Sequence, residues 1–188
     1  MSRYLCLCCL LSSIFFAACS LDYSEATISD ESESDIPDTV LYDVTYTSVR
    51  NFHLLLQVNA ESSKSYSKKN QAVLEKVELT EYDSQGTPTS TGRADQIIFN
   101  TENENADFTG DIYFHSKREE ASIIAENFYW DSENRLLTAD PEDRVVVQQD
   151  SGSQIKGTQF SADMKTNIIT YDSPVQGTFV TEDDDNAE

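Results

Sequence analysis

Residues 107–131 read DFTGDIYFHSKREEASIIAENFYWD and contain two runs of β-branched and aromatic residues, 108–114 and 123–130, separated by a polar joint. Such residues favour strands. Similar runs recur at intervals of about 8–12 residues, a spacing typical of a sandwich, a barrel or a β-solenoid. The sequence therefore predicts an all-β fold, in which only Ser63–Lys76 could hold a helical turn. The other expected strands cover residues 40–46, 52–58, 77–82, 95–99, 144–147, 154–158, 167–171 and 175–180.

Three of the expected strands contain a glycine, at Gly110, Gly157 and Gly177. A glycine inside a strand often marks a bulge or a tight bend, which curls the sheet. Repeated strand-turn units that cannot bury their own faces tend to stack into an open solenoid or a curled two-sheet roll. The alternative is a chance likeness among short glycine-containing strands.

The first 18 residues read MSRYLCLCCLLSSIFFAA, with Arg3 ahead of an apolar stretch. This stretch suits a signal peptide better than a spanning helix, which needs about 20 apolar residues. The small residues before Cys19 resemble the lipobox of bacterial lipoproteins, where the chain is cut ahead of the cysteine and the thiol receives acyl chains such as palmitate. We therefore expect a signal peptide at 1–18 and a lipid anchor at Cys19, with an uncleaved membrane anchor as the alternative.

The cysteines and the acidic segments bound the folded region. All four cysteines lie within residues 6–19, so one remains after cleavage and no intramolecular disulfide can form. Residues 19–38 and 182–188 are acidic, and such segments cannot bury enough apolar area to offset their ordering entropy. We expect an anchored flexible linker at 19–38, one folded domain at 39–181 and a disordered tail at 182–188.

The charged and catalytic residue types exclude several functions. The chain has 34 acidic and 13 basic side chains and a formal net charge of -21. A surface this acidic repels polyanions, which argues against nucleic acid as a partner. The two histidines, His53 and His115, lie in strand-like runs, and no Cys-His or His-x-x-x-His spacing offers transition-metal ligands. The sequence therefore predicts neither an enzyme nor a cofactor or metal site.

The order of motifs along the domain resembles the LptC family of the lipopolysaccharide export machinery. The aromatic-Asp strand at 128–131, the Thr-x-Asp turn at 138–140 and the valine strand at 145–147 are followed by a Gly-x-x-Phe-x-x-Asp pattern at 157–163. This run is the most specific part of the likeness. The further cues are Tyr82-Asp83-Ser84-Gln85-Gly86, Ala94-Asp95 and Phe108-Thr109-Gly110-Asp111-Ile112.

The resemblance implies a curled open β-roll of two facing antiparallel sheets on the periplasmic side of the envelope. Such proteins receive the acyl chains of lipopolysaccharide from an inner-membrane ABC-type export complex and pass them to a periplasmic LptA-like β-roll by edge-to-edge strand pairing. The expected lipid groove consists of Val77, Leu79, Ile97, Phe99, Ile112, Phe114, Val145 and Val147. The expected partner-docking edge consists of Ile168, Ile169, Thr170, Val175 and Phe179.

Two alternatives stay open at this stage. The groove residues would serve equally well as an ordinary packed core, in which case the chain is a surface or periplasmic lipoprotein that binds a protein partner without lipid cargo. The anchored Cys19 would hold the domain at the inner membrane or, as the alternative, at the outer membrane.

Overall fold

The computed structural model describes residues 35–181. The expected signal peptide 1–18, the anchor Cys19, the tail 182–188 and all but the last residues of the linker 19–38 lie outside the described residues. Between residues 35 and 181, no helix has the length and hydropathy that crossing a membrane requires.

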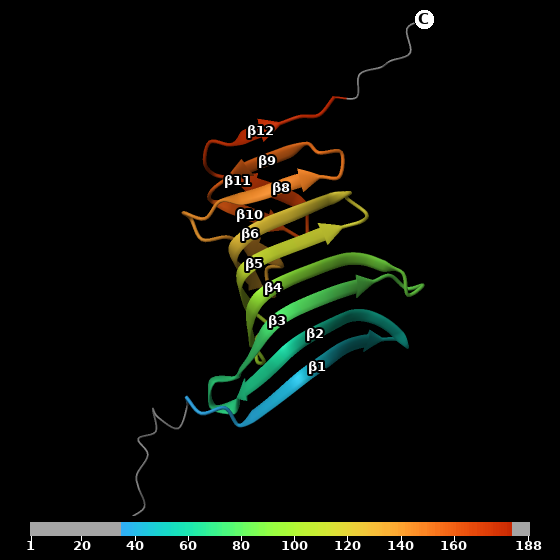
Figure 1. Ribbon diagram of the computed structural model, residues 1–188, viewed down its shortest axis with the longest axis vertical. Helices are drawn as coiled ribbons and strands as arrows, with labels where there is room; N and C mark the ends of the chain where they lie inside the picture. Colours follow the sequence, from blue (N-terminus) through green and yellow to red (C-terminus); the bar gives the residue numbers. More distant parts are fainter. Residues whose placement is uncertain (1–34, 182–188) are drawn as a thin grey trace, which may run out of the picture. The chain divides into compact units, whose positions relative to one another are not determined.

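A sheet of twelve strands, all paired antiparallel, makes up the described part of the chain (Figure 1). The all-β prediction is therefore confirmed. The segment Ser63–Lys76 is strand on both sides of a single 3₁₀ turn at Ser67–Lys69. The strands are β1 (Thr39–Arg50), β2 (His53–Tyr66), β3 (Gln71–Tyr82), β4 (Pro88–Asn100), β5 (Ala106–Ser116), β6 (Ala121–Asp131), β7 (Leu136–Thr138), β8 (Val145–Gln149), β9 (Gln154–Gly157), β10 (Phe160–Asp163), β11 (Ile168–Tyr171) and β12 (Gln176–Thr178).

The long strands fold back on themselves, as β5 shows. Phe108 and Phe114 lie six residues apart on this strand, a separation that spans about 20 Å in straight β-structure. Their ring centroids are only 5.6 Å apart. Between them, Gly110 has φ 75° and Asp111 has φ 41°, and the pairing with β4 and β6 skips these positions. The expected bulge at Gly110 is therefore present, and it bends the strand so that its two halves face each other.

The bends of neighbouring strands line up into one crease across the sheet. At each bend of β1 to β4 the register skips one charged residue, and the pairing of β4 with β5 also skips Ala94. Ion pairs tie neighbouring strands there, with Lys76 Nζ 2.7 Å from Asp95 Oδ1. We call this line the crease; it comprises Asp43, Glu61, Lys76, Asp95, Asp111 and Glu126.

The crease turns one continuous sheet into two facing layers. In β1, β3 and β5 the residues N-terminal to the crease belong to the first layer. In β2, β4 and β6 the residues C-terminal to the crease belong to it. The other half of each strand belongs to the second layer. At β6 the sheet divides, because residues 129–131 pair with β7 whereas residues 121–124 pair with β8. The first layer continues as β7-β10-β11 and the second as β8-β9-β12, and Figure 1 shows β10 and β11 behind β8 and β9. The expected two facing sheets are thus the two halves of one open sheet, because bulges bend the strands instead of ending them.

Candidate functional site

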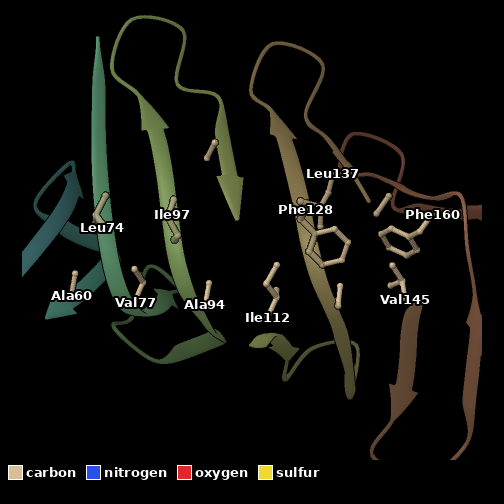
Figure 2. Close-up of a cluster of buried hydrophobic side chains, with 13 residues drawn as sticks. Ala60, Leu74, Val77, Ala94, Ile97, Ile112, Phe128, Leu137, Val145 and Phe160 are labelled. Atoms are coloured by element: carbon tan, nitrogen blue, oxygen red, sulfur yellow. The ribbon is translucent and has the colours of Figure 1, made fainter. Parts of the chain in front are cut away.

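The positions next to the crease form a row of small and branched apolar side chains on the inner face. Figure 2 shows Ala60, Val77, Ala94 and Ile112 side by side on successive strands. Val77, Ile112 and Val145 are among the most deeply buried side chains of the described chain. Branched and small residues alternate from strand to strand, which lets the side chains interdigitate where the two layers converge. The crease row comprises Val44, Ala60, Val77, Ala94, Ile112, Ala125, Val145 and Gly157.

A second row runs across the second layer, one inward position further from the crease. In its centre Phe114 lies directly over Gly92, where an added Cβ would be only 2.3 Å from Phe114 Cδ1. The missing side chain of Gly92 therefore provides the space that the ring fills. The second row comprises Tyr46, Val58, Leu79, Gly92, Phe114, Ile123, Val147, Ile155 and Gly177.

Two further rows line the inner face of the first layer. The third row comprises Leu41, Ser63, Leu74, Ile97, Phe108 and Phe128, and the fourth comprises Thr39, Ser65, Ala72, Phe99, Ala106, Trp130, Leu137, Ala162 and Ile169. All eight side chains of the expected groove lie in these four rows. Val77, Ile97, Ile112 and Val145 are buried, whereas Leu79, Phe99, Phe114 and Val147 are partly buried.

Five aromatic rings connect the two layers along the interior. Successive ring centroids lie 5.6, 6.4, 5.6 and 5.3 Å apart. Edge and tilted contacts at these distances are favourable beyond the apolar area that they bury. The series runs from β5 to β11 through Phe108, Phe114, Phe128, Phe160 and Tyr171.

The two ends of the interior differ. At the β1 end, Leu41 and Tyr46 remain 43% and 42% exposed. At the other end, Phe160 is 2% exposed, and the Tyr171 hydroxyl lies 3.4 Å from the backbone oxygen of Val145, across the two layers. Burial there raises the pKa of Tyr171 to about 12. The inner face is therefore partly uncovered at the edge strand β1, which we call the open end, and covered by packed side chains between β8 and β11.

Sequence reasoning missed one polar contact inside the interior. Tyr46 belongs to the second row and Ser63 to the third, and their hydroxyl oxygens lie 2.8 Å apart across the two layers. Ser63 is 1% exposed. Simple alternation along β2 from Val58 and Ala60 would place Ser63 on the outer face, but the bulge at Glu61 reverses the alternation. Only the bend itself could have revealed this pair.

The residues of the expected docking edge lie at two open edges of the sheet. Ile168, Ile169 and Thr170 belong to β11, which pairs only with β10, while Val175 and Phe179 flank β12, which pairs only with β9. All five are exposed. The longest edge strand is β1, and it carries exposed apolar side chains that sequence reasoning did not single out. Open edges of this kind offer unpaired backbone groups to another chain.

The outer face is polar and charged. Tyr113 on β5 lies below the Arg93 guanidinium, and its hydroxyl accepts a hydrogen bond from Ser122 at 2.9 Å. His115 Nε2 lies 3.2 Å from Asp150. Within residues 35–181, no three His, Cys, Asp or Glu side chains form a set that could hold a metal ion.

A family model described as "Lipopolysaccharide-assembly, LptC-related" matches residues 5–180. Among solved structures, the chain is similar to LptH, the LptA-homologous periplasmic component of the lipopolysaccharide transport device from Pseudomonas aeruginosa. That likeness has 14% sequence identity and a TM-score of 0.48, and it covers 67% of this chain and 95% of the other. No curated protein matches the sequence.

Proposed function

Because this chain belongs to the LptC-related family of lipopolysaccharide-assembly proteins, we propose that it accepts the acyl chains of lipopolysaccharide, or of a related glycolipid, between its two layers. It then passes them to a partner β-roll. Family membership itself assigns the chain to lipopolysaccharide transport in the periplasm, among proteins that bridge compartments and are not enzymes.

The observation that carries the proposal is the continuous apolar inner face. Apart from the polar residues near β1, its four rows are built from aliphatic, aromatic and small side chains on successive strands. Leu79, Phe99, Phe114 and Val147 are only partly buried, so each has apolar area left to cover. Covering such area releases about 25 cal/mol per Å². An acyl chain that covers part of this inner face would gain this energy. The sugars and phosphates of the glycolipid would stay in water.

The open edges lie at opposite ends of the strand order, so each edge would bind a different partner. Exposed Ile169 and Thr170 on β11, with Val175 and Phe179 beside β12, would pair with a strand of an LptA-like β-roll by β-augmentation. The β1 edge, at the opposite end of the strand order, would face the inner-membrane ABC-type export complex. A lipid on Cys19, after removal of residues 1–18, would keep the domain near that complex through the linker 19–38.

Site-specific photo-crosslinking in cells tests the cargo. A photoreactive residue is placed at Phe114 or Ile123, both on the inner face, and at Ile124, the neighbouring isoleucine that points to the outer face. Glu133, in the exposed turn after β6, is a second control. The proposal expects glycolipid adducts at Phe114 and Ile123 and none at the two controls. Stable, correctly localised variants without lipid adducts at either inner position would refute it.

The filled end of the interior favours one other function. Because Phe160 and Tyr171 close the roll between β8 and β11, the apolar rows could be a core alone, and the chain would then be a protein-interaction module without lipid cargo. The same experiment separates the two. The interaction module predicts protein adducts from a photoreactive residue at Ile169 and no lipid adduct at Phe114.

A further inference from the structure

One polar contact joins the second row to the third, and it lies at the open end. In the third row, Ser63 is flanked by Leu41 and Leu74, and the row continues with apolar residues as far as β6. Ser63 is 1% exposed, and its hydroxyl bonds to that of Tyr46 from the opposite layer. A hydroxyl in an apolar setting is costly unless it is hydrogen-bonded. The pair is thus stable as it stands, yet polar in two rows whose other side chains are apolar.

The two hydroxyls have unused hydrogen-bonding capacity. Each hydroxyl offers one donor and two acceptor positions, so the single bond between them leaves one donor and three acceptors. Tyr46 is 42% exposed and the neighbouring Leu41 is 43% exposed, so a ligand that enters at β1 meets these groups first. The remaining donor suits a carbonyl oxygen, and the acceptors suit a hydroxyl group.

The filled end fixes the direction of a bound chain. Between β8 and β11 the inner residues Val145 and Phe160 are fully covered, and no polar side chain of the third row lies between Leu74 and Phe128. From β1 to β6 the sheet spans five strand spacings of about 4.8 Å, roughly 24 Å in all. An apolar tail that follows the apolar side chains of the third row therefore runs from β1 toward β6, and the ligand's polar end is left at β1.

We infer that Tyr46 and Ser63 form a polar subsite that binds the carbonyl or hydroxyl group of an acyl chain at the β1 end, with the methyl end directed toward Phe128. This inference rests on the proposed function, because it assigns the orientation of the cargo within the same interior. It adds a specificity: the interior prefers a chain with an oxygen-bearing end over a plain hydrocarbon.

Competitive displacement from the purified full-length protein tests the subsite. The neutral fluorescent probe N-phenyl-1-naphthylamine is bound first, and then displaced with methyl dodecanoate or with dodecane. In Tyr46→Phe, Ser63→Ala and the double variant, methyl dodecanoate should displace the probe about threefold to tenfold less effectively, the loss expected for one hydrogen bond. Dodecane should displace it as well as before. Comparing each ligand between variants removes the difference in ligand solubility.

The outer face provides a matched control pair. Tyr113→Phe and Ser122→Ala remove a similar tyrosine–serine contact, of 2.9 Å, that does not face the interior. These variants should keep the wild-type response to both ligands, and circular dichroism verifies the fold of every variant. An equal change for ester and alkane, or no change for either, overturns the subsite while the proposed function stands. Failure of both ligands to displace the probe from the wild type overturns the proposed function and the subsite together.

Discussion

Gly92→Ala tests whether the Phe114 ring occupies the space over the second layer. An added Cβ would lie 2.3 and 2.5 Å from two ring carbons of Phe114 and 3.1 Å from Leu79 Cγ. Carbon atoms pack favourably at about 3.5–4.0 Å, so the ring must shift by more than about 1 Å. Overpacking of this kind costs about 1–3 kcal/mol. The reduced entropy of the unfolded chain offsets about 0.4–1 kcal/mol of that cost. The expected net loss of unfolding free energy is about 1.5 kcal/mol.

The same substitution should behave differently once the ring is gone. Phe114→Ala alone should cost about 3 kcal/mol, the low end for a phenylalanine in a core, because this side chain is only partly buried. In that background Gly92→Ala meets no ring and should stabilise the fold by about 0.5 kcal/mol. The double-mutant cycle should therefore show a coupling of about 2 kcal/mol.

Urea unfolding followed by the fluorescence of Trp130, the single tryptophan, measures all four proteins. Gly177→Ala on β12 is the control: its added Cβ would meet the exposed Phe179 ring at 3.1 Å, and this ring is free to move away. The control should change stability by less than about 0.5 kcal/mol. If Gly92→Ala costs the same in both backgrounds within about 0.5 kcal/mol, the ring does not fill the space over Gly92, and the argument for the second row fails.

Three further predictions concern the crease, acid stability and the edge. Ile112→Ala, beside the crease, should lower the unfolding free energy by about 3 kcal/mol in the same urea assay; a loss under about 1 kcal/mol would contradict the tight packing there. The backbone N–H of Asn134 donates to the Asp131 carboxylate and lowers its pKa, so this stabilisation is complete above about pH 4 and is lost as the pH falls through the lowered value. Asp131→Asn should thus make the melting temperature fall less steeply between about pH 4 and pH 2. An unchanged pH profile would count against a stabilising role of the Asp131 carboxylate. Ile169→Lys on the exposed edge should alter the unfolding free energy by less than about 0.5 kcal/mol yet reduce co-purification of an LptA-like partner. Val49→Lys on β1 should leave this co-purification unchanged. Equal co-purification of both variants would remove the case for β11 as the docking edge.

The strands were largely predictable from the sequence, whereas the face of each strand that turns inward was not, because a register error of one residue exchanges the two faces. β-branched and aromatic runs marked ten strands. Inward residues such as Leu79 and Phe114 were suggested by the family resemblance, and the pairing places both in the second row. The strand lengths were less predictable, because outward positions such as Lys64 are polar and make the second half of β2 look like a loop. The strands β7 and β10 were missed as strands, since three or four residues are too few to show a period.

The crease was not predictable, and with it the polar contact at the open end. Leu74 and Val77 both face the interior although they are three residues apart, an odd separation that alternation forbids. The bulge at Lys76 makes this possible, and a lysine in a charged surface gives no sign of a bend. Ser63 was hidden for the same reason. Glycine revealed the bend only on β5, at Gly110.

The division of the sheet at β6 sets where the molecule can open. Up to β6, parting the two layers would require bent strands to straighten, because each strand has one half in each layer. Beyond β6 the layers share no strand, and the chain crosses between them only in the loops 139–144, 158–159 and 172–175. Two of these loops are hydrogen-bonded to each other through Thr158 and Ser173, and the space between the layers is filled by Phe160 and Tyr171.

Up to β6, resistance to opening therefore comes from the continuous bent strands, and beyond β6 it comes from three connecting loops, packing and a few hydrogen bonds. Amide protons of β8–β12 should exchange through partial openings that leave β3–β5 protected. The β8–β12 end buries its side chains most completely. Its layers nevertheless part at the lowest cost in free energy, because no strand has to straighten or break.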